Sequence, residues 1–147
     1  MTAGAGYSGT PLPQKLGIKE GHWVTVLNAP KSFVTGMQMP RSVTVSEDWP
    51  KQPNNVILFF TRERTELEQA VSKLKARLDP AGGLWIAWPK KAARVPTDIT
   101  EDVVRAVALD CGLVDNKVCA IDATWSGLRL VFRLKDRPTP KALKEKG

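Results

Sequence analysis

The chain has 147 residues, of which 22 are lysine or arginine and 15 are aspartate or glutamate, for a formal net charge of +7. This length fits one domain with a buried core. The content of 42% hydrophobic and 25% charged residues is close to globular averages and excludes wholesale disorder. One histidine and two cysteines exclude most multi-ligand zinc, haem and iron–sulfur sites. We expect a basic single-domain protein, and the sequence indicates no cofactor.

Neither the N-terminal segment nor the apolar runs of the sequence indicate a membrane protein. Residues Met1–Thr10 contain no basic or apolar region, which argues against a secretory signal. The longest apolar run, Val56–Phe60, is far shorter than the roughly 20 residues of a membrane span. We therefore predict a cytoplasmic protein with no membrane partner, in which Cys111 and Cys119 are reduced.

The first half of the domain contains one predicted helical turn and three predicted strands. In Thr10–Leu16 the first residue suits an N-cap and the proline after it suits the first helical position. The β-rich segments His22–Asn28 and Ser42–Ser46 predict strands. Asn55–Thr61 is apolar without alternation, which is typical of a strand in the middle of a sheet covered on both faces.

A long helix is predicted next, beginning at a capping box made by Thr65 and Glu68. Apolar residues then recur at steps of four, three and four and form one stripe, namely Leu67, Val71, Leu74 and Leu78. The segment Asp79–Gly83 is predicted to end the helix.

A second strand–helix unit follows. Leu84–Trp88 predicts a buried strand, and Asp98 with Glu101 predicts another capping box. Gly112 suits the position after the helix. One helix face is expected to carry Ile99, Val103, Val107 and Cys111.

The chain is predicted to close with a hairpin of Lys117–Thr124 and Leu128–Leu134, joined by Trp125–Gly127. We expect a flexible segment at 1–9, one domain at 10–134 and a basic, disordered tail at 135–147. The element order predicts an α/β fold: a small, Rossmann-like, mostly parallel sheet with helices packed against it and a C-terminal antiparallel hairpin.

The order of elements from Asn55 to Leu134 resembles the second half of the class I methyltransferase fold, with Asp79–Gly83 as the helix-to-strand turn. The first half departs from that family. Methyltransferases of that family bind the methyl donor at a glycine-rich turn after the first strand. In this chain the corresponding segment, Asn28–Phe33, contains no glycine. Glu47 or Asp48 could imitate the acidic residue that binds ribose, but the favoured interpretation is a solvated loop carboxylate.

Several sequence segments also resemble the bacterial "domain of unknown function 3052" family. The similar segments are Gly6–Leu12, Trp88–Lys91, Thr97–Glu101 and Val118–Leu128, so the resemblance runs from Tyr7 to about Arg133. It implies a compact bacterial α/β domain and brings no assigned activity.

The candidate ligand site follows the predicted strand Leu84–Trp88, because open α/β sheets bind ligands at the carboxyl ends of their strands. Two lysines there and the amides of a following helix start could hold an anion. The residues proposed for this site are Tyr7, Trp88, Lys90, Lys91, Thr97, Asp98, Glu101 and Trp125. The simpler interpretation is a strand-exit loop with solvated lysines.

Other candidate chemistries find weaker support. Asp115 and Asp122 could divide acid and base roles, but nothing in the sequence makes them face each other. Ser126 has no nucleophile motif, His22 has only an apolar strand beside it, and Cys119 suits packing within a strand. We therefore expect no catalytic residue.

Five tryptophans and the positive charge permit nucleic-acid contact, mainly through the basic tail, but Trp23 and Trp85 are expected in the core. The predicted function is binding of an anionic small molecule or a macromolecular partner rather than catalysis. Two alternatives stay open: a nucleotide-cofactor-dependent enzyme of the methyltransferase-like class, and an accessory RNA- or ribosome-binding protein.

Overall fold

The computed structural model describes residues 10–136, which form one six-stranded sheet in the order β2-β1-β3-β4-β6-β5. The strands are β1 (Trp23–Leu27), β2 (Thr44–Ser46), β3 (Asn54–Phe60), β4 (Leu78–Pro89), β5 (Leu113–Ala120) and β6 (Trp125–Phe132). Strands β1 to β4 are parallel to one another, and β6 runs antiparallel to both β4 and β5. The predicted α/β class, with a mostly parallel sheet and a closing hairpin, is confirmed.

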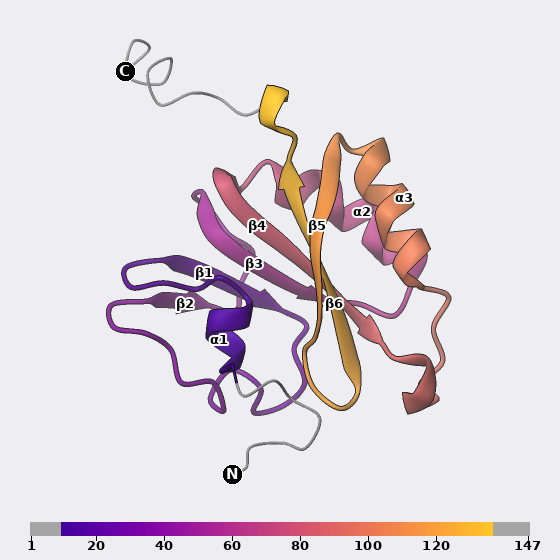
Figure 1. Ribbon diagram of the computed structural model, residues 1–147, viewed down its shortest axis with the longest axis horizontal. Helices are drawn as coiled ribbons and strands as arrows, with labels where there is room; N and C mark the ends of the chain where they lie inside the picture. Colours follow the sequence, from indigo (N-terminus) through magenta and orange to yellow (C-terminus); the bar gives the residue numbers. More distant parts are fainter. Residues whose placement is uncertain (1–9, 137–147) are drawn as a thin grey trace.

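The two faces of the sheet are covered differently (Figure 1). The long helices α2 (Arg64–Lys75) and α3 (Glu101–Asp110) pack on one face. The short helix α1 (Leu12–Lys15) and the segment between β1 and β2 cover the other. Two short 3-10 turns, Lys91–Ala93 and Leu134–Asp136, complete the structure.

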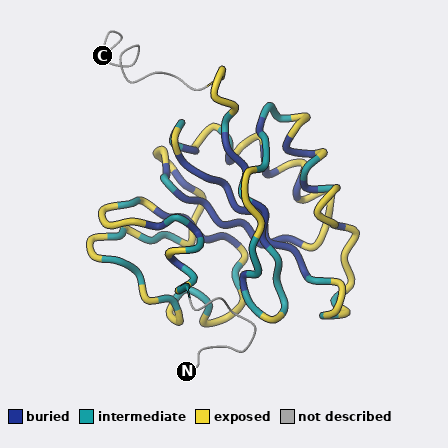
Figure 2. The backbone as a smooth tube through the Cα atoms, in the orientation of Figure 1, coloured by how far each residue is buried: buried dark blue, intermediate teal, exposed yellow. Residues whose placement is uncertain are grey.

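The core lies on both sides of the central strands β3 and β4, which are buried along most of their length (Figure 2). Ile57 and Phe59 face the long helices, whereas Leu58 and Phe60 face α1. Trp85 is fully buried, and its indole Nε1 donates a hydrogen bond to the Leu16 carbonyl at 3.0 Å. The predictions of a doubly covered β3 and a buried Trp85 are therefore confirmed.

The predicted start of α2 is wrong. The helix begins at Arg64, so Thr65 lies inside its first turn and cannot cap it. The backbone amide of Arg64 instead donates to the Asp98 carboxylate at 2.7 Å. An acceptor that is distant in sequence therefore satisfies one of the first amides of the helix.

The predicted cap of α3, Asp98, is also wrong. Since Asp98 binds α2, the N-cap of α3 is Thr100, whose hydroxyl accepts from the Val103 amide at 3.2 Å. Gly112, with a φ of 81°, follows the C-cap Cys111 as expected. At α1 the N-cap is Pro11 rather than Thr10.

The segment Asp79–Gly83 is not a turn. It belongs to β4, which begins at Leu78. Leu78 itself, predicted to lie on the apolar stripe of α2, is therefore buried in a strand instead. A Cβ on Gly82 would lie 2.5 Å from the Asn55 carbonyl oxygen of β3. The glycine is therefore required for close approach between two strands, and the pattern does not mark a helix end.

The hairpin and one tryptophan also depart from the prediction. The connection is Ile121–Thr124, because the Asp122 carboxylate accepts the amides of Thr124 and Trp125 and closes the turn before Trp125. Trp23, expected in the core, is 45% exposed because it is the first residue of β1 and pairs with the short edge strand β2.

Three further predictions bear on the ends of the chain and on its location. Among residues 10–136 no helix is long and apolar enough to cross a membrane. Cys111 and Cys119 are free thiols. The predicted segment 1–9 and most of the predicted tail lie outside the described residues, although Lys135 and Asp136 belong to the last 3-10 turn.

Candidate ligand site at the carboxyl edge of the sheet

The strand order places a crevice between the carboxyl ends of β1 and β3. The chain leaves β1 for β2 on one side and returns to β3 on the other, so the sheet changes direction at this point. Open α/β sheets bind ligands at such a switch point. We call this region the β1–β3 crevice.

Polar side chains bridge the β1–β3 crevice. Asn28, directly after β1, donates from its amide to the Phe60 carbonyl of β3 at 3.2 Å and reaches the Glu66 carboxylate at 3.5 Å. The Thr61 hydroxyl donates to the other oxygen of Glu66 at 2.5 Å. These groups therefore satisfy one another across the gap where a ligand would lie.

An aromatic stack fills the crevice from the α1 face. The Phe33 ring lies 4.9 Å from the Phe60 ring, which in turn lies 5.0 Å from the Trp125 ring, and both pairs meet edge to face. The loop after β1 thus packs an aromatic side chain onto β3. Asn28 and Ser32 of this loop adopt the left-handed conformation, with φ of 60° and 67°, without any glycine.

The space that remains in the β1–β3 crevice is about 200 Å³ and lies between Asn28, Trp49 and Glu66. Typical ligand pockets measure about 300–1,000 Å³. S-adenosylmethionine, the donor that the fold implies, needs an open glycine-rich turn here. The residues present do not fit that molecule.

A second, larger pocket lies on the face of the long helices, between the end of β4 and the start of α3. We call it the β4–α3 pocket; it has a volume of about 520 Å³. The Lys90 amide donates to the Thr124 carbonyl at 2.7 Å and so fixes the exit of β4 beside the hairpin. The residues that line the pocket are Trp88, Pro89, Lys90, Lys91, Thr97, Ile99, Thr100, Glu101 and Ser126.

The charges around the β4–α3 pocket are unequal. Glu101 is paired with Arg105 on α3 at 2.5 Å. Hydrogen bonds from this guanidinium to Glu101 and then to Asp115 raise the pKa of Arg105. Within the described part of the chain, Lys90 and Lys91 have no ion pair or side-chain hydrogen bond. The pocket therefore presents two unpaired cations, whereas its one carboxylate is already neutralised.

Five of the eight residues predicted for the site line this pocket: Trp88, Lys90, Lys91, Thr97 and Glu101. Asp98 is turned to the start of α2. Trp125 packs in the core on the α1 face. Tyr7 lies outside the described residues.

The sequence interpretation missed Ser126, which also lines the pocket. It is paired with Trp88 across the β4–β6 ladder, a register that depends on where the hairpin turns. The incorrect turn prediction therefore concealed it.

The other candidate chemical groups do not assemble. Asp115 pairs with Arg105 on α3, whereas Asp122 accepts amides within its own turn. Burial raises the pKa of the Cys119 thiol despite the nearby Lys15 and Lys117, which disfavours a nucleophilic thiolate. No group of three or more potential metal ligands occurs among residues 10–136.

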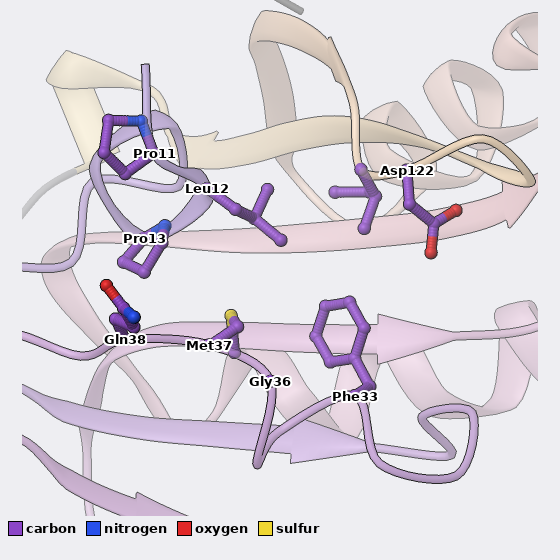
Figure 3. Close-up of a pocket in the computed structure, with 9 residues that line it drawn as sticks. Pro11, Leu12, Pro13, Phe33, Gly36, Met37, Gln38 and Asp122 are labelled. Carbon is purple, nitrogen blue, oxygen red and sulfur yellow. The ribbon is translucent and has the colours of Figure 1, made fainter. Parts of the chain in front are cut away.

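A third cavity, of about 350 Å³, lies on the α1 face near the same edge of the sheet. Figure 3 shows Phe33 and Met37 on one side of it, facing Leu12 and Asp122 on the other. Sequence patterns gave no signal for it, because it is formed by a loop, a four-residue helix and a turn. Its lining is mainly apolar.

Comparisons with known proteins agree with this architecture. The structure is similar to a SAM-dependent methyltransferase from Aquifex aeolicus, with a TM-score of 0.55, 17% identity, and coverage of 80% of this chain and 85% of that one. It is also similar to the magnesium protoporphyrin IX methyltransferase from Synechocystis PCC 6803 with bound SAM, with a TM-score of 0.54, 9% identity, and coverage of 83% and 74%.

No protein-family model and no curated protein matches the chain. The resemblance to the "domain of unknown function 3052" family therefore stays a prediction. At such low identity a structural likeness establishes the fold alone. The chain has a class I methyltransferase-like, Rossmann-like fold whose β1–β3 crevice is occupied by its own side chains.

Proposed function

We propose that this protein is a binding domain on a methyltransferase-like fold that takes a small anionic ligand in the β4–α3 pocket. The observation that carries the proposal is the pair of lysines, Lys90 and Lys91, which line an open pocket without ionic partners among the described residues. Charge-assisted hydrogen bonds from lysine to a phosphate or carboxylate are among the stronger polar contacts in proteins.

The remaining lining supports an anion with an apolar part. Ser126 and Thr100 bring hydroxyl groups to the pocket, and Ile99 and Pro89 provide apolar surface. The carboxylate of Glu101 is held by Arg105, which reduces its repulsion of an incoming anion. A ligand with one anionic group and a small apolar body matches this lining.

Native mass spectrometry of the freshly purified protein tests for a retained molecule. AMP and inorganic phosphate serve as defined probes in calorimetric titrations. We expect binding that the Lys90→Ala/Lys91→Ala double variant weakens and that a Lys31→Ala control, which changes an exposed lysine outside the pocket, preserves. Binding of these probes that is unchanged in the double variant contradicts the proposal.

A second candidate is S-adenosylmethionine-dependent methyl transfer. The structural comparisons favour this candidate over the first, since the similar structures are methyltransferases. The occupied β1–β3 crevice opposes it. Calorimetric titration with S-adenosylmethionine separates the two candidates, because only the second requires this molecule to bind.

A further inference from the structure

A polar cavity of about 380 Å³ lies at the opposite edge of the sheet, where β1, β3 and β4 begin. We propose that this cavity, the amino-edge cavity, binds the phosphate group of a small molecule through Lys19, His22, Asn55 and Arg129. None of these residues lines the β4–α3 pocket, so the inference is independent of the proposed function.

Two uncharged donors line the amino-edge cavity. The side-chain Oδ1 of Asn55 accepts from the Trp23 backbone amide at 2.8 Å, which fixes the side chain and leaves its NH2 group as a donor. The Nδ1 atom of His22 accepts from the Lys19 amide at 3.1 Å. The neutral imidazole therefore carries its proton on Nε2, which is also a donor.

Two cations add charge to the same cavity. Lys19 lines it from the turn before β1, and Arg129 lines it from β6. A side chain at Gly83 would collide with the Arg129 guanidinium, so this glycine lets the arginine lie across the backbone of β4. Guanidinium groups match the geometry of phosphate oxygens.

One carboxylate, that of Asp79, lines the amino-edge cavity, and its Oδ1 accepts from the Ala81 amide at 2.9 Å. It opposes an anion but is outnumbered by the donors around it. The presence of this carboxylate gives a test with a definite sign. Removing its charge must strengthen anion binding, whereas removing the charge of Lys19 must weaken it.

The test uses the full chain, with inorganic sulfate and phosphate as probes and amide chemical shifts as the measurement. We expect saturable shifts near His22, Asn55 and Gly82. Lys19→Ala weakens binding at least about fivefold and Asp79→Asn strengthens it about threefold, the scale of one charge-assisted contact. Lys31→Ala, an exposed lysine outside the cavity, leaves affinity within about twofold.

The pH dependence gives a second readout. Burial and the charge of Lys19 lower the pKa of His22, whereas the carboxylate of Asp79 raises it. Arg129 is the other charged residue that lines the cavity. Sulfate keeps its charge between about pH 7.5 and about pH 5.5, so tighter binding at the lower pH reports the proton gained by His22. His22→Gln removes this rise.

Three results overturn the inference. They are the absence of saturable shifts at the amino edge, shifts confined to Lys90 and Lys91, and unchanged sulfate affinity in both Lys19→Ala and Asp79→Asn. Since Asp79→Asn is isosteric, it keeps the test decisive even if another variant does not fold.

Discussion

The β1–β3 crevice and the β4–α3 pocket lie at the same edge of one sheet, yet they are built in opposite ways. In the first, Asn28 hydrogen-bonds across the gap and Phe33 packs onto Phe60. In the second, Lys90 and Lys91 line an open volume of about 520 Å³. The fold provides both locations, and the side chains decide which of them is open to a ligand.

This difference separates architecture from activity. The strand order resembles that of methyltransferases, whose ligands the fold would place at the switch point. Here the loop after β1 contributes to the core instead. A fold therefore constrains where a site can lie, whereas function depends on the groups found there.

The largest expected effect comes from opening the closed crevice. Phe60→Ala removes the ring that contacts both Phe33 and Trp125, so we expect a loss of about 3–5 kcal/mol in the free energy of unfolding. Urea denaturation measures it. The Lys90→Ala/Lys91→Ala variant is the control and should unfold like the wild type within about 0.5 kcal/mol. A Phe60→Ala loss below about 1 kcal/mol would mean that the stack does not hold the crevice closed.

In the β4–α3 pocket, substitutions should change ligand affinity rather than stability. The same double lysine variant is expected to lose about 1–3 kcal/mol of affinity for AMP, because two charge-assisted contacts disappear. Calorimetry measures the change. An equal loss in Lys31→Ala would show that the effect is general electrostatic attraction and not a pocket.

A smaller effect is expected from the contact between Asp98 and the start of α2. Asp98→Ala removes the acceptor of the Arg64 amide and should cost about 1 kcal/mol of unfolding free energy. Asp98→Asn retains an acceptor oxygen and should recover most of it. Equal losses in both variants would contradict a capping role for Asp98.

The smallest effect concerns the loop that closes the crevice. Ser32 has a φ of 67°, which strains a residue with a Cβ, and it is exposed. Ser32→Gly should therefore stabilise the protein by up to about 1 kcal/mol in thermal unfolding. Destabilisation would indicate that the hydroxyl or the restricted loop matters more than the strain.

The sequence predicted what depends on short-range patterns. The apolar run of β3 and the stripe of α2 were sufficient to place both, and the exit of β4 identified most of the pocket lining. The errors came from contacts between distant residues. Asp98 caps a helix 34 positions earlier, and Gly82 is required by the backbone of β3. Neither partner is visible in local spacing.

The site was harder to predict than the fold because its lining depends on register. Ser126 reaches the pocket only because the Asp122 turn pairs it with Trp88. The sequence predicted only in part that side chains would fill the β1–β3 crevice. The missing glycines argued against a donor site, but nothing local indicated that Phe33 would pack onto Phe60.

Calorimetric titration of the full chain with S-adenosylmethionine tests the central claim most directly. Because Asn28, Phe33 and Glu66 occupy the β1–β3 crevice, we predict no saturable binding with a dissociation constant below about 1 mM. Parallel titration with AMP shows whether the protein sample can bind a ligand. A micromolar dissociation constant for S-adenosylmethionine would contradict the account and favour the methyltransferase candidate.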